Sequence, residues 1–496
     1  MSQDTEDEID PEVHYANLVN NLDIPCEDDD LFCDLLFLAL GEMEEMLPHI
    51  REIVTRDENT RQYVLKDAVK TIRHSGINGH VLDSFFEKLA LPIASKFIEA
   101  FNAAPEPKIV FVAIIPFYQI LRESIVLRQR GYTTWLLHLT ELDAETEKMF
   151  SKHFDSVQPL PRNLDILGVV LRRLDMKLVH MQTQQFEVHV PMTRYVLENR
   201  GDAKSFCEFY DVLSMLIDHD VLKRLRRDAA DYDFANERYI FETADAVSCR
   251  FDTRWREELR EKFPAAGPMI EMHPYPLDEF IGYGQKKLSS ENNRPHLVYP
   301  AHITKFEADG SVQWPTIRTL GAVPYYYATT LTGQGLDFTI YNEITHSVDD
   351  PGYKLYRELE REDPLFHFLP GIPPEQFTEV VGRYNFGINL TTADPAKMEV
   401  RDSQYDVFAT KIFTFLEAGL PMIVSKELRV MANFVEYYGV GFTVSRHELD
   451  TIGERIKSFD YAAAVANIRK YNEAHSMDRE IERVIAIYHQ LVPEWS

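Results

Sequence analysis

One segment in the C-terminal part of the chain constrains its fold more than any other. It reads Lys411-Ile-Phe-Thr-Phe-Leu-Glu-Ala-Gly-Leu-Pro-Met-Ile-Val-Ser425 and changes character at Gly419. The first part has the pattern of a helix, the glycine and Pro421 end that helix, and a short apolar strand follows at once. Such an order is typical of a sheet with parallel strands. The segment therefore predicts an α/β fold, with its opening lysine at the carboxyl edge of the sheet.

Two series of apolar runs indicate that this α/β pattern occurs twice. Runs that predict buried parallel strands lie first at 108–115, 133–139, 177–180, 206–210 and 246–249. A second series lies at 296–299, 337–341, 365–369, 386–390, 422–424 and 441–444. A helix at 120–129 joins the first two strands into a βαβ unit. The predicted fold class is therefore α/β, with two Rossmann-like, doubly wound domains that face a cleft.

The length of 496 residues and the order of these runs predict several domains. We expect an acidic disordered tail at 1–30, a small helical module at 31–104, a first Rossmann-like domain at 105–280, a second at 281–480, and a C-terminal helix at 481–496. The helical module carries apolar residues at helical spacing, such as Leu65, Val69 and Ile72. Packing, self-association and binding of a protein partner are the roles open to this module.

The charge and the cysteines limit the partners and the location of the protein. The formal net charge is −28, and residues 1–50 hold fifteen Asp or Glu and no Lys or Arg. Such a chain repels nucleic-acid phosphates. The four cysteines lack zinc or disulfide spacing, which favours a reducing compartment, and the sequence shows neither a signal peptide nor a transmembrane run. We expect a cytoplasmic protein that does not bind nucleic acid.

Four segments, in this order, resemble the GT-B glycosyltransferases, especially the family 4-like, nucleotide-sugar-dependent group. Residues 237–238, 244–247 and 257–259 resemble the stretch that ends the first domain of that family. Met269-Ile-Glu-Met-His-Pro-Tyr-Pro-Leu-Asp278 is similar to the crossing between the domains, and Phe368-Leu-Pro-Gly-Ile-Pro-Pro-Glu-Gln-Phe377 to the loop beside the nucleotide base. Residues 411–421 resemble the family's "K…EYlaaGlPvv" box. The resemblance covers roughly residues 108–490.

The resemblance implies an enzyme that moves a sugar from a nucleotide sugar to an acceptor hydroxyl. The donor would be a substrate, most simply UDP-linked, and no cofactor is implied. No metal is expected either, because side chains and helix ends replace the divalent cation in this fold. The acceptor stays open among a glycan, a lipid carrier and a protein, and the stereochemical outcome stays open as well.

Four residues of the second domain are the first candidates for donor binding. Lys411 is expected to contact a phosphate or the ribose, because a diphosphate leaving group requires positive charge. A helix-surface lysine is the alternative. His302 and Lys305 follow the first strand of this domain, where family members place phosphate ligands, and a solvated loop is the alternative. The resemblance also places Leu369 in the loop beside the nucleotide base.

The box departs from the family where the ribose is recognised. Many retaining members have two carboxylates eight positions apart, which fall here on Asp406 and Thr414. The first position keeps its acid, whereas a single hydroxyl at the second cannot bind a diol as a carboxylate does. Glu417 lies three residues further along nearly the same helix face and is the candidate substitute. An exposed or capping carboxylate is the alternative for Glu417.

Two residues of the first domain are the catalytic candidates. His180 and Asp211 each lie at the end of a predicted strand and are expected to face the cleft. An imidazole or carboxylate there would orient or deprotonate the acceptor hydroxyl. A core histidine and a helix N-cap are the respective alternatives. The basic run at 223–227 is either a solvated helix face or a contact for a phosphorylated acceptor or an anionic membrane.

Two other functions remain open from the sequence. A non-catalytic GT-B-like binding or scaffold protein is favoured by the missing carboxylate at Thr414 and by the glycine-poor loop at 115–119. A nucleotide-sugar epimerase would use the same architecture without an acceptor. Replacement of Lys411 by alanine discriminates between the first two, because an enzyme should lose turnover whereas a scaffold should keep its partner.

Overall fold

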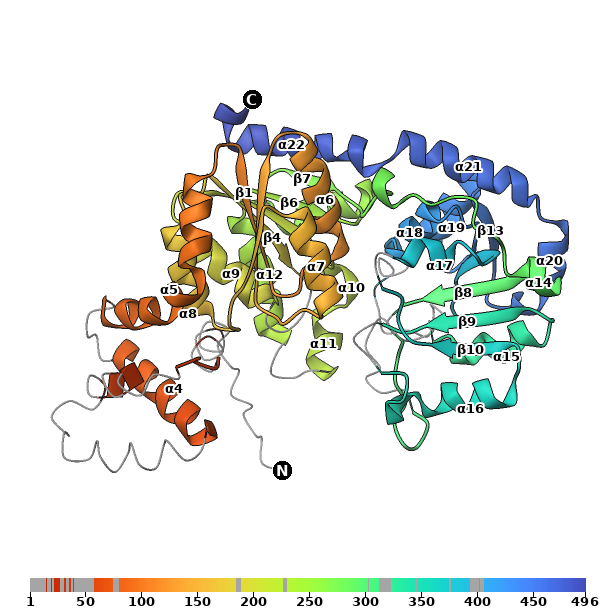
Figure 1. The fold of residues 1–496 in the computed structure, drawn as a ribbon, viewed down its shortest axis with the longest axis horizontal. Helices are drawn as coiled ribbons and strands as arrows, with labels where there is room; N and C mark the ends of the chain where they lie inside the picture. The colour runs from red at the N-terminus through yellow and green to blue at the C-terminus, as the bar shows by residue number, and fades with distance from the viewer. Residues whose placement is uncertain are drawn as a thin grey trace.

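The computed structural model describes most of the chain after residue 57. The described ranges are 58–74, 80–183, 189–225, 230–301, 303–311, 323–343, 347–373, 376–392, 401 and 406–496, with a few positions before residue 58. The predicted acidic tail at 1–30 lies largely outside them. Two parallel sheets with helices on their faces form the body of the molecule (Figure 1).

The first sheet has seven parallel strands in the order β3-β2-β1-β4-β5-β6-β7. Every residue of β1, β4 and β6 is buried, as expected for strands covered on both faces. The order reverses between β1 and β4, which is where such sheets place ligands. The strands are β1 (Lys108–Ala113), β2 (Thr133–His138), β3 (Ser156–Pro159), β4 (Leu178–Thr183), β5 (Lys204–Phe209), β6 (Ala246–Cys249) and β7 (Met269–Glu271).

Helices with side-chain caps connect these strands. Asp143, Asn163 and Asp252 each accept a hydrogen bond from the N–H three residues later and so begin α7, α8 and α13. The helices of this part are α4 (Glu58–His74), α5 (His80–Ala103), α6 (Tyr118–Gln129), α7 (Ala144–His153), α8 (Leu164–Arg173), α9 (His189–Asn199), α10 (Leu213–Leu216), α11 (His219–Leu225), α12 (Ala230–Thr243) and α13 (Thr253–Lys262). The helix α5 packs against α8 and thereby joins the helical module to the first domain.

The second sheet has six parallel strands in the order β10-β9-β8-β11-β12-β13. The strands are β8 (His296–Pro300), β9 (Asp337–Tyr341), β10 (Phe366–Leu369), β11 (Phe386–Asn389), β12 (Met422–Ser425) and β13 (Gly441–Val444). Its α-helices are α14 (Ser289–Asn292), α15 (Tyr325–Thr332), α16 (Lys354–Glu362), α17 (Phe377–Val381), α18 (Lys411–Glu417), α19 (Arg429–Tyr438), α20 (Ile452–Ser458) and α21 (Tyr461–Ala474). Short 3-10 helices are η2 (Asp278–Phe280), η3 (Pro351–Tyr353) and η7 (Leu449–Thr451).

Two glycines position α18 on this sheet. A Cβ atom at Gly387 of β11 would lie 2.6 Å from the ring of Phe415, so the helix packs directly on the bare strand backbone. Gly419 has a φ of +63° and ends the helix in the left-handed conformation. The helix stop predicted from the sequence is therefore present, and it leads straight into β12.

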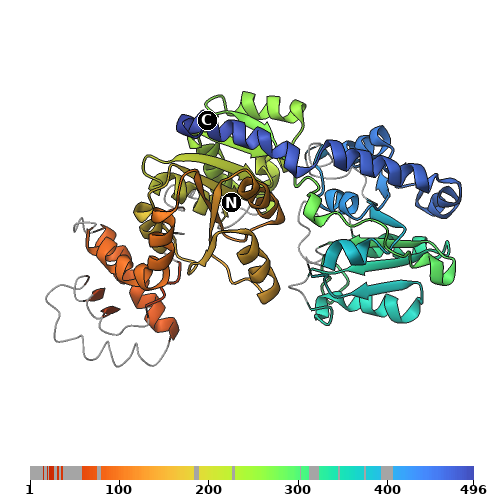
Figure 2. The same ribbon diagram turned by 45° about the horizontal axis from the view of Figure 1, so that its top comes forward.

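The chain returns to the first domain through α22 (Met477–Leu491) and η8 (Pro493–Trp495). The long blue helix lies along the first domain in both views (Figures 1 and 2). Arg130 Nε donates to Glu482 at 2.8 Å, and the Tyr132 hydroxyl lies 2.9 Å from His489 Nε2. The C-terminal segment therefore belongs structurally to the first half of the molecule.

The predicted fold class, α/β with two doubly wound domains, is confirmed. Two strands were not predicted: β3 is polar and only half-buried, and β7 is three residues long and lies within the proline-rich crossing. The strand β4 extends to Thr183 instead of ending at His180. Among the described helices, none has the length and apolar character needed to cross a bilayer.

Candidate functional site

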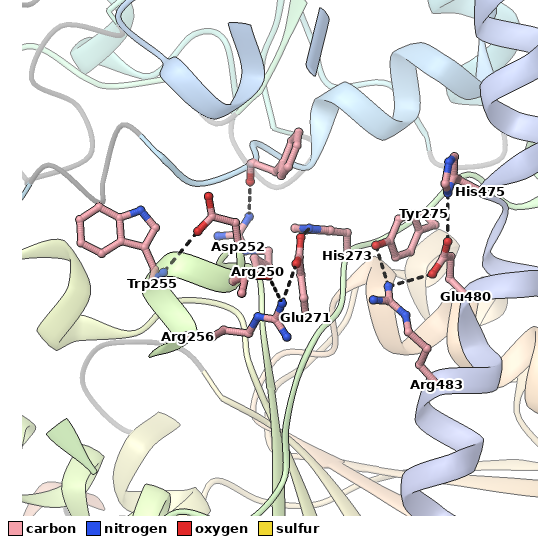
Figure 3. A network of polar contacts seen from close by, with 12 residues as sticks. Arg250, Asp252, Trp255, Arg256, Glu271, His273, Tyr275, His475, Glu480 and Arg483 are labelled. Carbon is pink, nitrogen blue, oxygen red and sulfur yellow. Dashed lines mark hydrogen bonds and ion pairs between the residues drawn. The ribbon is translucent and has the colours of Figure 1, made fainter. Parts of the chain in front are cut away.

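A buried arginine links the two domains at the carboxyl edge of the first sheet. Arg250 follows β6 and donates through Nη1 to the carbonyl of Phe408, in the second domain, at 2.8 Å (Figure 3). Its Nη2 donates to Asp211 at 2.8 Å, and its Nε to the carbonyl of Tyr210 at 2.6 Å. The guanidinium also lies 3.9 Å from the centroid of the Tyr210 ring. These contacts hold the segment that leads into α18 against the first domain.

The crossing between the domains continues this network (Figure 3). His273 Nε2 lies 2.8 Å from Glu271, and burial lowers the pKa of His273 below its usual value. The imidazole ring stacks on Phe413 of α18 with a centroid distance of 5.5 Å. Further along, Arg483 of α22 donates to the Tyr275 hydroxyl at 2.8 Å. The crossing, α18 and α22 therefore form one connected joint.

A cavity of about 410 Å³ lies where the two domains and the crossing meet. Its volume is within the range of small-molecule sites, about 300–1,000 Å³, and domain interfaces are a common place for such sites. The lining residues are Tyr118 and Arg122 of α6, Met149, Lys152 and His153 of α7, Glu279 and Phe280 of η2, Phe377 and Thr378 of α17, and Thr414 and Glu417 of α18.

The wall of this cavity contains a buried ion pair between the domains. Arg122 donates to Glu417 through Nε at 3.3 Å and through Nη2 at 2.8 Å, and the Leu277 N–H donates to the same carboxylate at 2.9 Å. Arg122 is 3% exposed and Glu417 is 2% exposed. Burial raises the pKa of Glu417, and Arg122 opposes that rise. The sequence alternative for Glu417, an exposed or capping carboxylate, is therefore wrong.

Lys411 lies at the carboxyl edge of the second sheet, as predicted. Its ammonium is 3.7 Å from the centroid of the Tyr299 ring, near the end of β8. No carboxylate of a described residue lies within ion-pair distance of Lys411. One turn later, Thr414 lines the cavity, and its hydroxyl donates to the Lys411 carbonyl at 2.8 Å. The N–H groups of Ile412 and Phe413 already bond to carbonyls of the preceding turn, so positive charge here comes chiefly from side chains.

Of the other residues predicted to bind the sugar donor, Lys305 is less available to a ligand than Lys411. Lys305 Nζ forms an ion pair with Asp350 at 2.7 Å, and this hydrogen bond raises the pKa of Lys305. Leu369 is the last residue of β10 and is half-buried. His302 lies outside the described residues. A phosphate would therefore have to compete with Asp350 for Lys305.

Asp406 holds the domains together and does not face the cavity. Arg429 donates to its carboxylate through Nε at 2.7 Å and through Nη2 at 2.8 Å. The indole N–H of Trp255, in the first domain, donates to it at 3.2 Å. Asp406 is 5% exposed and already accepts three hydrogen bonds, which corrects the expectation of an open donor ligand.

The predicted position of His180 is also corrected. His180 is fully buried in the middle of β4, because that strand extends to Thr183, and its Nδ1 lies 2.7 Å from the Tyr488 hydroxyl. Burial lowers the pKa of His180. Asp211 does lie after β5, at the carboxyl edge, but it is 3% exposed and bound by Arg250. The N-cap of α10 is Val212, so Asp211 does not cap that helix.

Arg122, the buried cation that the first domain contributes to the cavity wall, was not predicted from the sequence. The residues around it on α6, from Gln119 to Leu127, are all buried. A charged residue inside such a helix must find a partner, and that requirement is the only signal the sequence offers.

Comparison with known proteins agrees with this architecture. Residues 329–485 match the family model described as glucosyltransferase 3-like, C-terminal domain. The fold is similar to that of Anabaena Alr3699/HepE in complex with UDP and glucose, with a TM-score of 0.52 and 12% identity, over 77% of this chain and 99% of that chain. The same protein in complex with UDP-glucose gives a TM-score of 0.52 and 11% identity, over 76% and 99%.

A further solved structure, TarM, matches with a TM-score of 0.52 and 8% identity, over 78% of this chain and 99% of that chain. No curated protein sequence matches the chain. The solved structures confirm the predicted GT-B fold, and the family match confirms the resemblance to the glycosyltransferases. The chain therefore has a GT-B fold, and its residues 329–485 match a glucosyltransferase family model. The second domain is similar to the C-terminal domain of the glucosyltransferase 3-like proteins.

Proposed function

We propose that the protein transfers a sugar from a UDP-linked donor, UDP-glucose first among them, to an acceptor hydroxyl. The cavity between the domains carries this proposal, because Thr414 lines it one turn after Lys411 and both domains contribute to its wall. The choice of UDP-glucose is supported by the glucosyltransferase 3-like family match and by the UDP-glucose complex of HepE.

Two cations from opposite domains would stabilise the leaving diphosphate. Lys411 comes from the start of α18, and Arg122 comes from α6 across the cavity. A guanidinium has five N–H groups, and Glu417 accepts from Nε and Nη2, so Arg122 can still donate to a ligand in the cavity that it lines. Charge placed where the transition state develops negative charge is a large contribution to catalysis. We therefore propose that no divalent cation is needed at the diphosphate.

The ribose would contact a single hydroxyl, and the acceptor would contact a carboxylate that an arginine already holds. Thr414 offers one hydroxyl to the ribose, whereas Glu417 is committed to Arg122 and Leu277 and would position the guanidinium. On the acceptor side, Asp211 remains the candidate, with its carboxylate oriented by Arg250. We also propose a cytoplasmic location, supported by Cys207 and Cys249, which are buried thiols outside any disulfide.

Calorimetric titration with UDP-, GDP- and CMP-linked sugars tests the proposal. We expect UDP-glucose to bind and Lys411→Met to weaken binding about 10–100-fold, the loss expected for a charge-assisted hydrogen bond. Lys426→Met is the matched control, because Lys426 lies in the same domain but pairs with Glu448 at the surface. Failure of all these sugars to bind would leave the scaffold function, and isomerisation of the donor without an acceptor would indicate an epimerase.

A further inference from the structure

We propose that the interior of the first domain binds a divalent metal ion, Zn²⁺ before others, through Glu123, His180 and Glu208. These residues come from α6, β4 and β5, and they are 0%, 0% and 1% exposed. Each offers one ligand atom, and the three atoms lie within 4.8 Å of one another. Ligands bound about 2.1 Å from one metal lie about 3–4 Å apart, so small side-chain rotations complete the site.

The two carboxylates are oriented as metal ligands usually are, with one oxygen bound and the other free. Gln119 Nε2 donates to Glu123 Oε1 at 3.3 Å. Gln182 Nε2 donates to Glu208 Oε1 at 2.8 Å. The remaining oxygens, Glu123 Oε2 and Glu208 Oε2, have no hydrogen-bond partner among the described residues. Such supporting hydrogen bonds fix the direction of ligand side chains around a metal.

The imidazole of His180 is arranged in the same way. Its Nδ1 lies 2.7 Å from the hydroxyl of Tyr488, which comes from α22. Its Nε2 lacks a hydrogen-bond partner within the described part of the chain and lies 3.5 Å from Glu208 Oε2. Glu123 Oε2 is 3.7 Å from His180 Nδ1. A buried polar atom without a partner is costly, and three of them meet here.

A metal ion accounts for this cluster better than a shared proton does. One proton between the two carboxylates would satisfy the carboxyl pair but would leave His180 Nε2 with only a long contact, 3.5 Å, to Glu208 Oε2. Two carboxylates that are 0% and 1% exposed and share one cluster are costly to bury together without a compensating charge.

The ligand set indicates the kind of metal. Two carboxylate oxygens and one imidazole nitrogen suit Zn²⁺, whereas Ca²⁺ requires six to eight oxygens and Mg²⁺ usually keeps several waters. Gln119 Oε1 is also buried and without a hydrogen-bond partner among the described residues, and we propose it as the candidate fourth ligand. The site does not overlap the lining of the cavity between the domains. Its role would be structural, joining α6, β4 and β5 and, through Tyr488, α22.

Metal analysis of the full-length protein tests the proposal without any measurement of activity. We expect protein expressed with added zinc, and purified without a metal-affinity step, to retain about one Zn²⁺ per chain by mass spectrometry. Glu123→Gln and Glu208→Gln should lower the zinc content at least about 10-fold. Glu482→Gln, on the exposed face of α22, should retain the wild-type content. Wild-type protein that binds neither Zn²⁺, Mn²⁺ nor Fe²⁺ after refolding in excess metal would overturn the proposal.

A milder variant covers the case in which the ligand variants do not fold. Tyr488→Phe keeps all three ligands and removes only the hydroxyl beside His180 Nδ1. It should fold and bind zinc about 10–100-fold more weakly, which is the usual effect of removing a supporting hydrogen bond at a metal site. Zinc affinity equal to that of the wild type would count against the His180 ligand and hence against the site.

Discussion

Replacing Arg122 by methionine tests whether a charged contact holds the domains together at the cavity. Methionine retains most of the apolar length, so the main loss is the guanidinium. Glu417 then keeps only the hydrogen bond from the Leu277 N–H, out of three. Removal of one partner from a buried ion pair costs about 3–5 kcal/mol, because the other charge is left without compensation. We expect a destabilisation of about 3 kcal/mol for Arg122→Met near neutral pH.

The cost should depend on pH, because Glu417 can take up a proton. Burial raises the pKa of Glu417 in the folded state, and loss of Arg122 raises it further. A folded-state pKa above the unfolded value means that stability is highest below the unfolded pKa and falls as pH rises through the folded pKa. The penalty of Arg122→Met should therefore be larger at about pH 8 than at about pH 5, which is near the ordinary glutamate pKa.

Urea unfolding of the single and double variants measures this contact. In Arg122→Met/Glu417→Gln, no buried charge is left, so we expect the combined loss to be smaller than the sum of the single losses by about 2 kcal/mol. Arg128→Met is the control, since Arg128 lies on the same helix but forms an exposed pair with Asp155. Additive losses, or no dependence of the penalty on pH, would show that the pair is solvated and would refute the reasoning.

Three further predictions concern α18 and the cavity. Lys411→Met should lower kcat/KM for UDP-glucose about 10²–10³-fold. Calorimetry should show only a small change in Tm, because the contact with Tyr299 is the one lost. Unchanged kcat/KM would contradict the diphosphate role. Thr414→Trp should fill the cavity and abolish UDP binding by calorimetry, with the fold retained by circular dichroism; undiminished binding would place the donor elsewhere. Gly387→Ala should destabilise the protein by about 1–3 kcal/mol in urea, because its Cβ would meet Phe415; a loss near zero would mean that α18 shifts freely.

The strands were the most predictable part of the fold. The runs at 337–341 and 441–444 coincide with β9 and β13, because strands buried on both faces are rich in apolar residues. β3 escaped prediction because it is polar and half-buried. The end of β4 was misplaced because Gln182 and Thr183, although polar, continue the strand in the interior.

The candidate site was predictable only where local chain chemistry determines it. The positions of Lys411 and Thr414 follow from a helix that starts at the sheet edge and stops at Gly419. Arg122 pairs with Glu417 across 295 positions of sequence, and only the approach of the two domains brings them together. A single sequence contains no signal for such a pairing, so the partners of Glu417 required the structure.

A crystal structure of the protein grown with UDP is the most direct test of the central claim. We expect the nucleotide in the cavity between the domains, with its diphosphate within hydrogen-bond distance of Lys411 and Arg122 and its ribose beside Thr414. UDP bound instead in the separate hollow lined by Arg469 and Arg479, or Lys411 directed away from the bound nucleotide, would contradict the claim.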